Sequence, residues 1–293
     1  PNLFLVSFIQ SRMGIEISFA RWMAIGIPLV LVFVPVCWWL LVKAIYQLRD
    51  EPVPGLDRLL AELRTGQGPM SKGERLTLGV FILTALAWIT RPLLVRISIG
   101  GWQPLGGLTD PGIAVAAALL LFVVPVRLRS GEFLMNWDTA VKLPWGLLIL
   151  FGGGLSLAAA LDSSGFSAWL GNQVGALAAL PVLLLVGLVV ALVIFLTELT
   201  SNTATTATLI PVLYAVATGL GLDPFLLIIP AGIAASCAFM LPVATPPNAV
   251  VFGSGLIGIP EMARAGLWLN LIGILLVTAL AYLVAIPLLG SLP

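Results

Sequence analysis

One stretch of ten residues, from Thr197 to Thr206, gathers most of the chemistry that this apolar sequence offers. It reads TELTSNTATT, so six of its side chains carry hydroxyl groups, one carries an amide and one a carboxylate. Hydroxyl, amide and carboxylate oxygens are the ligands that hard cations prefer, and hydroxyl and amide groups can also donate hydrogen bonds to an anion. No Lys or Arg occurs between Lys142 and Arg264. The stretch therefore indicates a binding site made of neutral groups and one acid.

A second interruption of an apolar run follows further along the chain, at Ala244 to Asn248, with the sequence ATPPN. Its two prolines remove backbone donors and prevent a helix from running through. Two broken apolar segments in one membrane protein are typical of a substrate and ion site in a secondary transporter. We therefore expect the two interruptions to lie together.

Composition places the chain in a membrane. Of its 293 residues, 60% are hydrophobic and only 9% are charged, too few to cover the surface of a soluble domain, so we expect an all-α polytopic membrane protein. A net charge of +1 gives no reason to expect nucleic acid as a partner. Histidine is absent, which removes histidine-based catalysis and metal ligation. The chain is not expected to be an enzyme.

Apolar segments that can enter a bilayer alternate with polar loops. They lie at residues 22–42, 76–90, 111–126, 143–161, 181–222, 224–257 and 266–290. Ten of the 14 basic residues fall in loops on one side, including an amphipathic segment at 43–75, and an excess of Lys and Arg marks the cytoplasmic side. The sequence predicts a multi-pass protein of the plasma (inner) membrane, with residues 43–75 cytoplasmic and the C-terminus external.

The apolar run at 181–222 has two interpretations, because it can form two full spans around the polar block or a re-entrant hairpin with the block at its tip. Both return the chain to the same side of the membrane. A cytoplasmic loop would be expected to carry basic residues, and the block has none. We therefore favour the hairpin, whose tip must line a cavity or be covered by protein.

Two further features precede the hairpin. Three consecutive glycines, Gly152 to Gly154, indicate close packing between helices rather than a ligand site. The stretch from Gly131 to Val141 is expected to be an amphipathic piece on the cytoplasmic side.

Ser201-Asn202-Thr203 followed by the break at 244–248 resembles the second half of a divalent anion/sodium symporter, the family of di- and tricarboxylate and sulfate transporters. Each half of such proteins holds one Ser-Asn-Thr at a re-entrant hairpin tip and one Thr-Pro-Pro-Asn-like helix break, in inverted repeats. Either motif alone is a weak signal, but the pair at this spacing is a strong one. Pro1-Asn2 resembles the end of the first-half break, so the resemblance implies a fragment holding the second repeat plus the end of the first.

The resemblance also implies two modules. Residues 1–50 and 178–293 are expected to form a transport domain that contains the hairpin, the broken helix and the last span. Residues 51–177 are expected to form an amphipathic linker and a scaffold that makes a homodimer. Movement of the first module against the second, an elevator-type alternating access, would carry the site across the bilayer.

By position in the family motifs, the resemblance implies a sodium site made of oxygens from Thr197, Thr200 and Asn202 and of the backbone carbonyl of Ala244. Sodium prefers oxygen ligands, and helix breaks free carbonyl groups for that purpose. Glu198, the one acid near this block, is expected to be either an orienting group behind the site or a proton site.

For the anion, the resemblance implies hydrogen bonds from Ser201, Asn202 and Thr203 to one carboxylate, with Thr245 and Pro246 lining the opposite wall. A helix that starts near Thr203 also directs free N–H groups at that carboxylate. Since no arginine is available at this depth, bound sodium ions must supply most of the compensating charge.

The expected function is sodium-coupled symport of small divalent anions, above all C4-dicarboxylates such as succinate, malate and fumarate. Na⁺ is then the co-transported ion, and no organic cofactor is expected. Alternatives are transport of sulfate or a tricarboxylate, or coupling to protons. An intramembrane enzyme is disfavoured by the missing histidine, and a passive channel by the compact, proline-broken polar cluster.

Overall fold

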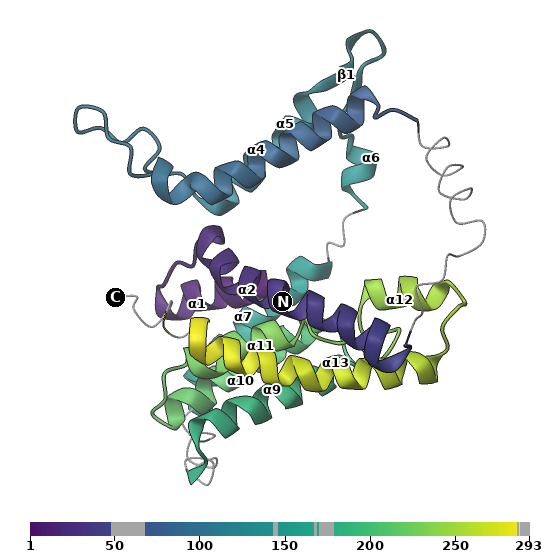
Figure 1. Cartoon of the computed structure of the whole chain (residues 1–293). Helices are drawn as coiled ribbons and strands as arrows, with labels where there is room; N and C mark the ends of the chain where they lie inside the picture. Colours follow the sequence, from purple (N-terminus) through teal and green to yellow (C-terminus); the bar gives the residue numbers. More distant parts are fainter. Residues whose placement is uncertain (48–67, 143–145, 167–168, 170–178, 286, 288–293) are drawn as a thin grey trace. The chain divides into compact units, whose positions relative to one another are not determined.

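The computed structural model describes residues 1–47, 68–142, 146–166, 169, 179–285 and 287, and almost all of its regular structure is helical (Figure 1). The chain divides into two compact units. Unit 1 contains residues 1–17, 25–47 and 145–293, and unit 2 contains residues 18–24 and 48–144. The prediction of an all-α polytopic architecture is confirmed.

All the regular structure among the described residues of unit 1 is helical. Its elements are α1 (Asn2–Met13), most of α2 (Phe19–Trp39), the π-helix η1 (Leu40–Ile45), α7 (Gly146–Ser163), α9 (Val182–Thr197), α10 (Asn202–Gly219), α11 (Phe225–Ala234), α12 (Pro246–Gly253), α13 (Ile259–Leu280) and the π-helix η4 (Ala281–Ala285). Pro28 and Pro35 lie inside α2, so neither proline ends that helix. This agrees with an apolar pattern that resumes after each of them.

The core of unit 1 forms where α9 packs against α11 and α13, and α10 packs against α7 and α11 (Figure 1). The short α1 lies on α10 and α11, where Phe4 and Phe8 are fully buried. The ring of Phe8 meets Tyr214 of α10 edge to face at 5.6 Å. The two helices that flank the polar block are therefore held by apolar packing on several sides.

One of the three consecutive glycines has the role that the sequence indicated. A Cβ atom on Gly154 would lie 2.7 Å from the ring of Phe4 and 3.1 Å from Cβ of Ala207, closer than packed atoms allow. Gly152 and Gly153 face open space within the part of the chain that the structure describes. Gly154 alone allows α7 to approach α1 and α10 closely.

Unit 2 is a helix pair with a small β-hairpin. It contains α4 (Lys72–Leu94), α5 (Asp110–Val123), β1 (Pro125–Arg127), the 3₁₀ turn η2 (Leu128–Ser130), β2 (Glu132–Phe133) and α6 (Trp137–Ala140). Helix α4 starts with a capping box, in which Ser71 and Glu74 each accept a hydrogen bond from the other's backbone N–H. Helices α4 and α5 pack together.

The expected amphipathic piece at Gly131–Val141 is a short strand followed by a short helix. Its first residues form β2, which pairs with β1 in an antiparallel register, and only the four residues of α6 are helical. Gly131 turns the chain with a φ of 66°, which favours glycine. The expected amphipathic segment at 43–75 lies largely outside the described residues.

Three helical stretches in the described residues are long and apolar enough to cross a membrane. They are Phe19–Ile45, Lys72–Leu94 and Ile259–Val284. Helix α5, expected as a span at 111–126, has only 14 residues, which rise about 21 Å against the roughly 30 Å of a bilayer core. Helices α9 and α11 are also short and apolar, as expected when helices stop within a protein at membrane depth.

Candidate binding site at two interrupted helices

The polar block forms the tip of a helical hairpin. Helix α9 ends at Thr197 and α10 begins at Asn202, so residues 198–201 make the turn. Sixteen residues without charge precede the turn, and they give way to polar groups where the helix stops. Ser201 is the N-cap residue of α10, but its side chain makes no capping hydrogen bond. Its exposed hydroxyl is therefore not used to close the helix.

Three oxygen atoms meet behind this tip. The Oγ1 atom of Thr197, which is fully buried, lies 2.7 Å from Oδ1 of Asn202 and 3.2 Å from the carbonyl oxygen of Ala235, to either of which its hydroxyl can donate. Ala235 directly follows α11, and the last carbonyl groups of a helix lack partners within the helix. The arrangement brings together hydroxyl, amide and carbonyl oxygens, the ligand types suited to a hard cation.

Thr200 does not share this cluster. Its hydroxyl donates to the carbonyl oxygen of Leu196 at 3.0 Å and also contacts the hydroxyl of Thr205. Thr206 likewise donates to the carbonyl oxygen of Asn202 at 2.7 Å. These hydroxyl groups bond to the preceding turn, as threonines in buried helices often do. Thr200 remains a predicted sodium ligand, but in this structure its hydroxyl is engaged elsewhere.

The second interruption lies between α11 and α12, at residues 235–245. Thr245 is the N-cap residue of α12 and its Oγ1 accepts the backbone N–H of Asn248 at 3.3 Å. Pro246 occupies the first position of α12, where a missing N–H costs nothing. The amide of Asn248 donates to the carbonyl oxygens of Ala238 and Leu241, both at 3.0 Å. Each residue of the Thr-Pro-Pro-Asn motif, Pro247 apart, therefore has a defined part in shaping the break.

Glu198 connects the tip to the break. Its carboxylate accepts the backbone N–H groups of Phe239 at 2.8 Å, Met240 at 2.9 Å and Leu241 at 3.0 Å. Asn270 of α13 adds a fourth hydrogen bond, from Nδ2 to Oε1 at 2.7 Å. Glu198 is 3% exposed and Asn270 is fully buried. The carboxylate is an acceptor in all four contacts. The orienting role and the proton site both stay predictions for Glu198.

A glycine on α13 makes this arrangement possible. A Cβ atom on Gly266 would overlap the carbonyl group of Phe239 and come 2.5 Å from Cα of Met240. The unwound backbone whose N–H groups face Glu198 therefore lies directly on α13. Only a residue without a side chain fits at position 266.

The predicted anion ligands come from the hairpin tip and from the start of α12. Ser201 is exposed at the tip, while Asn202 and Thr203 are partly buried in the first turn of α10. On the other side, Thr245 is partly buried and Pro246 exposed, and the predicted cation ligand Ala244 is buried. Within the described residues, no hydrogen bond joins the first group directly to Thr245 or Pro246. The two interruptions are instead linked through Thr197 to Ala235 and through Glu198 to residues 239–241.

Three participants were not identified from the sequence. The side chain of Ala235 gives no sign that its backbone carbonyl contacts Thr197. This contact becomes visible only once the end of α11 is known. Asn270 is the one amide in the apolar span at 266–290, and such a residue could have been flagged as a partner for the one nearby acid. Gly266 looks like any other glycine of a membrane helix.

Apolar helices together with a hairpin tip and a broken helix that meet through polar groups define a secondary membrane transporter. A family model described as the sodium:sulfate symporter transmembrane region matches residues 1–290. The chain belongs to this family. This match confirms the family resemblance expected from the two motifs. Members of the family are transporters and not enzymes.

Curated relatives give a closer comparison. The chain is 39% identical over 285 residues to the sodium-dependent dicarboxylate transporter SdcS of Staphylococcus aureus strain USA300, which is 97% of this chain and 54% of the relative. The proteins of the same name from strains MW2 and N315 match with the same identity and coverage. The chain therefore spans about half the length of the curated relatives it matches.

Proposed function

We propose that this chain carries one half-site of a sodium-coupled symporter of small dicarboxylates, above all the C4 acids succinate, malate and fumarate. The observation that carries the proposal is the cluster of Thr197 Oγ1, Asn202 Oδ1 and the Ala235 carbonyl oxygen at the hairpin tip. The names of the S. aureus relatives, which are sodium-dependent dicarboxylate transporters, support both the ion and the substrate class.

In this proposal Na⁺ binds among the oxygens of Thr197, Asn202 and Ala235. The Ala244 carbonyl and Thr200, assigned from the family motif, complete the shell when the cation draws the tip together. Na⁺ would displace the hydroxyl hydrogen of Thr197 from the line between Thr197 and Asn202, because both oxygens then face a positive charge. The cation thereby replaces a hydrogen bond that otherwise closes the tip.

The dicarboxylate would bind on the outer side of the same tip. Ser201, Asn202 and Thr203 donate to one carboxylate, helped by the free N–H groups of the first turn of α10, and Thr245 and Pro246 line the facing wall. No Lys or Arg occurs between residues 142 and 264 to offset the charge of a dianion. Burying an uncompensated charge is costly, so sodium bound next to the anion would make its binding favourable. This charge balance is the proposed origin of coupling.

The larger movements are proposed from the family. Residues 1–50 and 178–293 would act as the transport domain and residues 51–177 as the linker and dimerising scaffold, and an elevator-type motion would expose the site on alternate sides. Residues 43–75 would lie in the cytoplasm and the C-terminus outside the inner membrane, as the basic residues indicate.

The test is uptake of labelled succinate into proteoliposomes by the full-length transporter, with and without an inward sodium gradient. Asn202→Ala should abolish sodium-driven uptake, whereas Thr208→Ala, an exposed threonine further along α10, should leave it unchanged. Uptake that ignores sodium but follows a pH gradient would support proton coupling, and competition by sulfate or citrate but not malate would support the other anion classes. Sodium-driven uptake that survives Asn202→Ala would contradict the assigned site.

A further inference from the structure

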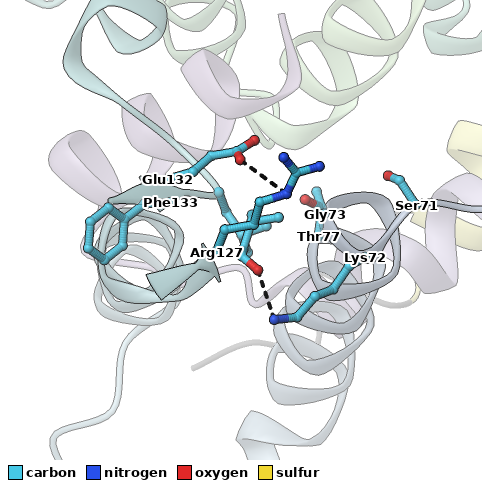
Figure 2. Close-up of a pocket in the computed structure, with 9 residues that line it drawn as sticks. Ser71, Lys72, Gly73, Thr77, Arg127, Glu132 and Phe133 are labelled. Carbon is cyan, nitrogen blue, oxygen red and sulfur yellow. Dashed lines mark hydrogen bonds and ion pairs between the residues drawn. The ribbon is translucent and has the colours of Figure 1, made fainter. Parts of the chain in front are cut away.

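A pocket of about 300 Å³ lies in unit 2, at the N-terminal end of α4 (Figure 2). Its walls come from the first turns of α4 and from the β1–β2 hairpin. Lys72 reaches from α4 toward β1, and Arg127 extends from β1 toward α4, so that both cationic groups border the same space (Figure 2). The proposed transport site does not use this pocket.

The pocket is basic on balance. Of the residues that line it, Lys72 and Arg127 are basic and Glu132 is acidic. Arg75 and Arg129 lie nearby in the sequence but do not line the pocket. Glu74 is engaged by the capping box at Ser71. The Nζ of Lys72 donates to the carbonyl oxygen of Val126 at 2.8 Å, which fixes the ammonium group at the wall and leaves its other two hydrogens for a ligand.

The side chain of Arg127 is largely exposed to a ligand that enters the pocket. Its Nε lies 3.6 Å from Oε2 of Glu132, while its side chain is 76% exposed. A guanidinium group can bind a phosphate with two parallel N–H donors, and an exposed ion pair at this distance offers little energy in competition. The pocket therefore presents two cationic groups, from Lys72 and Arg127, to an anionic group.

A second hollow, shallow and apolar, adjoins the first one along one face of α4. The residues that line it, Glu74, Thr77, Leu78 and Phe81, lie on one face of the helix, and Thr77 lines both hollows. Leu78 and Phe81 are 44% and 67% exposed, although they lie inside a helix long and apolar enough to cross a membrane. Along this face of α4 the surface is therefore cationic at the start of the helix and apolar at Leu78 and Phe81.

We propose that the two hollows bind one anionic phospholipid, with its phosphate between Lys72 and Arg127 and an acyl chain along Leu78 and Phe81. Basic pockets at the cytoplasmic ends of membrane helices are suited to anionic headgroups, and residues 43–75 and 127–129 lie on the predicted cytoplasmic side. The continuous order of polar pocket and apolar groove matches a phospholipid and does not match a free phosphate, which would leave the groove uncovered.

A second copy of the chain fits the surface less well. In a two-fold interface the same patch meets itself, so Lys72 and Arg127 of one copy would be brought close to those of the other. Cationic groups held close together repel each other unless an anion lies between them. A lipid phosphate supplies such an anion directly.

Native mass spectrometry of the full-length transporter tests the proposal. The detergent-purified protein is incubated with dioleoylphosphatidylglycerol or with dioleoylphosphatidylcholine, and the lipids retained per chain are counted. Lys72→Gln with Arg127→Gln should weaken retention of phosphatidylglycerol by about tenfold or more, given the usual contribution of a basic residue to binding anionic lipid. Retention of phosphatidylcholine should change little. Arg96→Gln, an exposed arginine beyond the other end of α4, is the matched control.

Two additional variants keep the test decisive. Arg127→Gln alone leaves the Lys72 hydrogen bond intact and should still lower phosphatidylglycerol retention, so a folding defect in the double variant cannot hide the effect. Phe81→Ala should weaken both lipids, because it shortens the apolar groove. Equal retention of the two lipids by wild type, or an equal effect of Arg96→Gln, would overturn the proposal. Loss of dimer mass with an unchanged lipid count would assign the surface to a second copy instead.

Discussion

Asn270 Nδ2 donates a 2.7 Å hydrogen bond to Oε1 of Glu198, and this contact joins the last long helix to the tip of the hairpin. The same carboxylate holds three consecutive backbone N–H groups of the broken segment. A single acid therefore fixes three parts of the chain that are far apart in sequence. Because Glu198 directly follows Thr197, whose hydroxyl contacts Asn202, we expect the carboxylate to help hold the proposed sodium site in place.

Glu198→Gln should destabilise the protein by about 1–3 kcal/mol, because an amide has one acceptor oxygen and turns an N–H group toward buried backbone donors. The measurement is thermal unfolding of the full-length transporter in detergent, with Glu261→Gln in the first turn of α13 as control. If Glu198 is instead a proton site, we expect a different result. The variant would then keep its melting temperature, and its uptake would lose its dependence on pH.

Thr197→Val should raise the sodium concentration needed for half-maximal uptake by about tenfold, the equivalent of roughly 1.4 kcal/mol. Valine has nearly the shape of threonine and removes only the oxygen that faces Asn202. Thr197→Ser keeps that oxygen and should behave like wild type. Sodium-dependence curves that coincide for valine and wild type would remove Thr197 from the proposed ligand set.

Sequence patterns predicted the interruptions themselves but not the contacts between them. The end of α9 and the start of α10 follow from a charge-free apolar run that gives way to Thr, Ser and Asn. The prolines at 246 and 247 predicted a break at 244–248, whereas in the structure the break lies at 235–245 and the two prolines begin α12. The partners of Glu198 could not be predicted, since backbone N–H groups of residues 239–241 carry no side-chain signal. Their availability depends on where α11 unwinds and on how closely α13 approaches.

Arg91 shows the same limit in unit 2. It directly follows the apolar segment at 76–90, and its neighbours in the sequence do not identify a partner for it. In the structure its Nε lies 2.7 Å from Oδ1 of Asp110, and the residue is 8% exposed. Asp110 also accepts the backbone N–H of Phe19 at 3.0 Å. Pairing over such separations depends on packing of α4 against α5, which no local pattern encodes.

Gly266→Ala should lower the melting temperature and reduce transport together. The added methyl group would overlap the Phe239 carbonyl, so either α13 or the segment held by Glu198 must shift. Gly253→Ala is the matched control, because it adds the same methyl group on α12 where nothing lies within 4 Å. The control should be neutral or slightly stabilising, by up to about 1 kcal/mol, since alanine favours a helix over glycine. Equal melting temperatures for the two variants would contradict the close approach at position 266.

Arg91→Gln should destabilise unit 2 by about 3 kcal/mol or more, because it leaves the partly buried carboxylate of Asp110 without its cation. The guanidinium also donates to the carbonyl oxygen of Leu108 at 3.3 Å, so a second hydrogen bond is lost with it. Arg96→Gln removes an equal charge from an exposed position nearby and should change the melting temperature little. If the loss comes from an unpaired charge rather than from lost packing, then Arg91→Gln combined with Asp110→Asn should recover part of the stability. If the double variant loses more stability than the two single variants together, the broken Arg91–Asp110 pair is not the source of the loss.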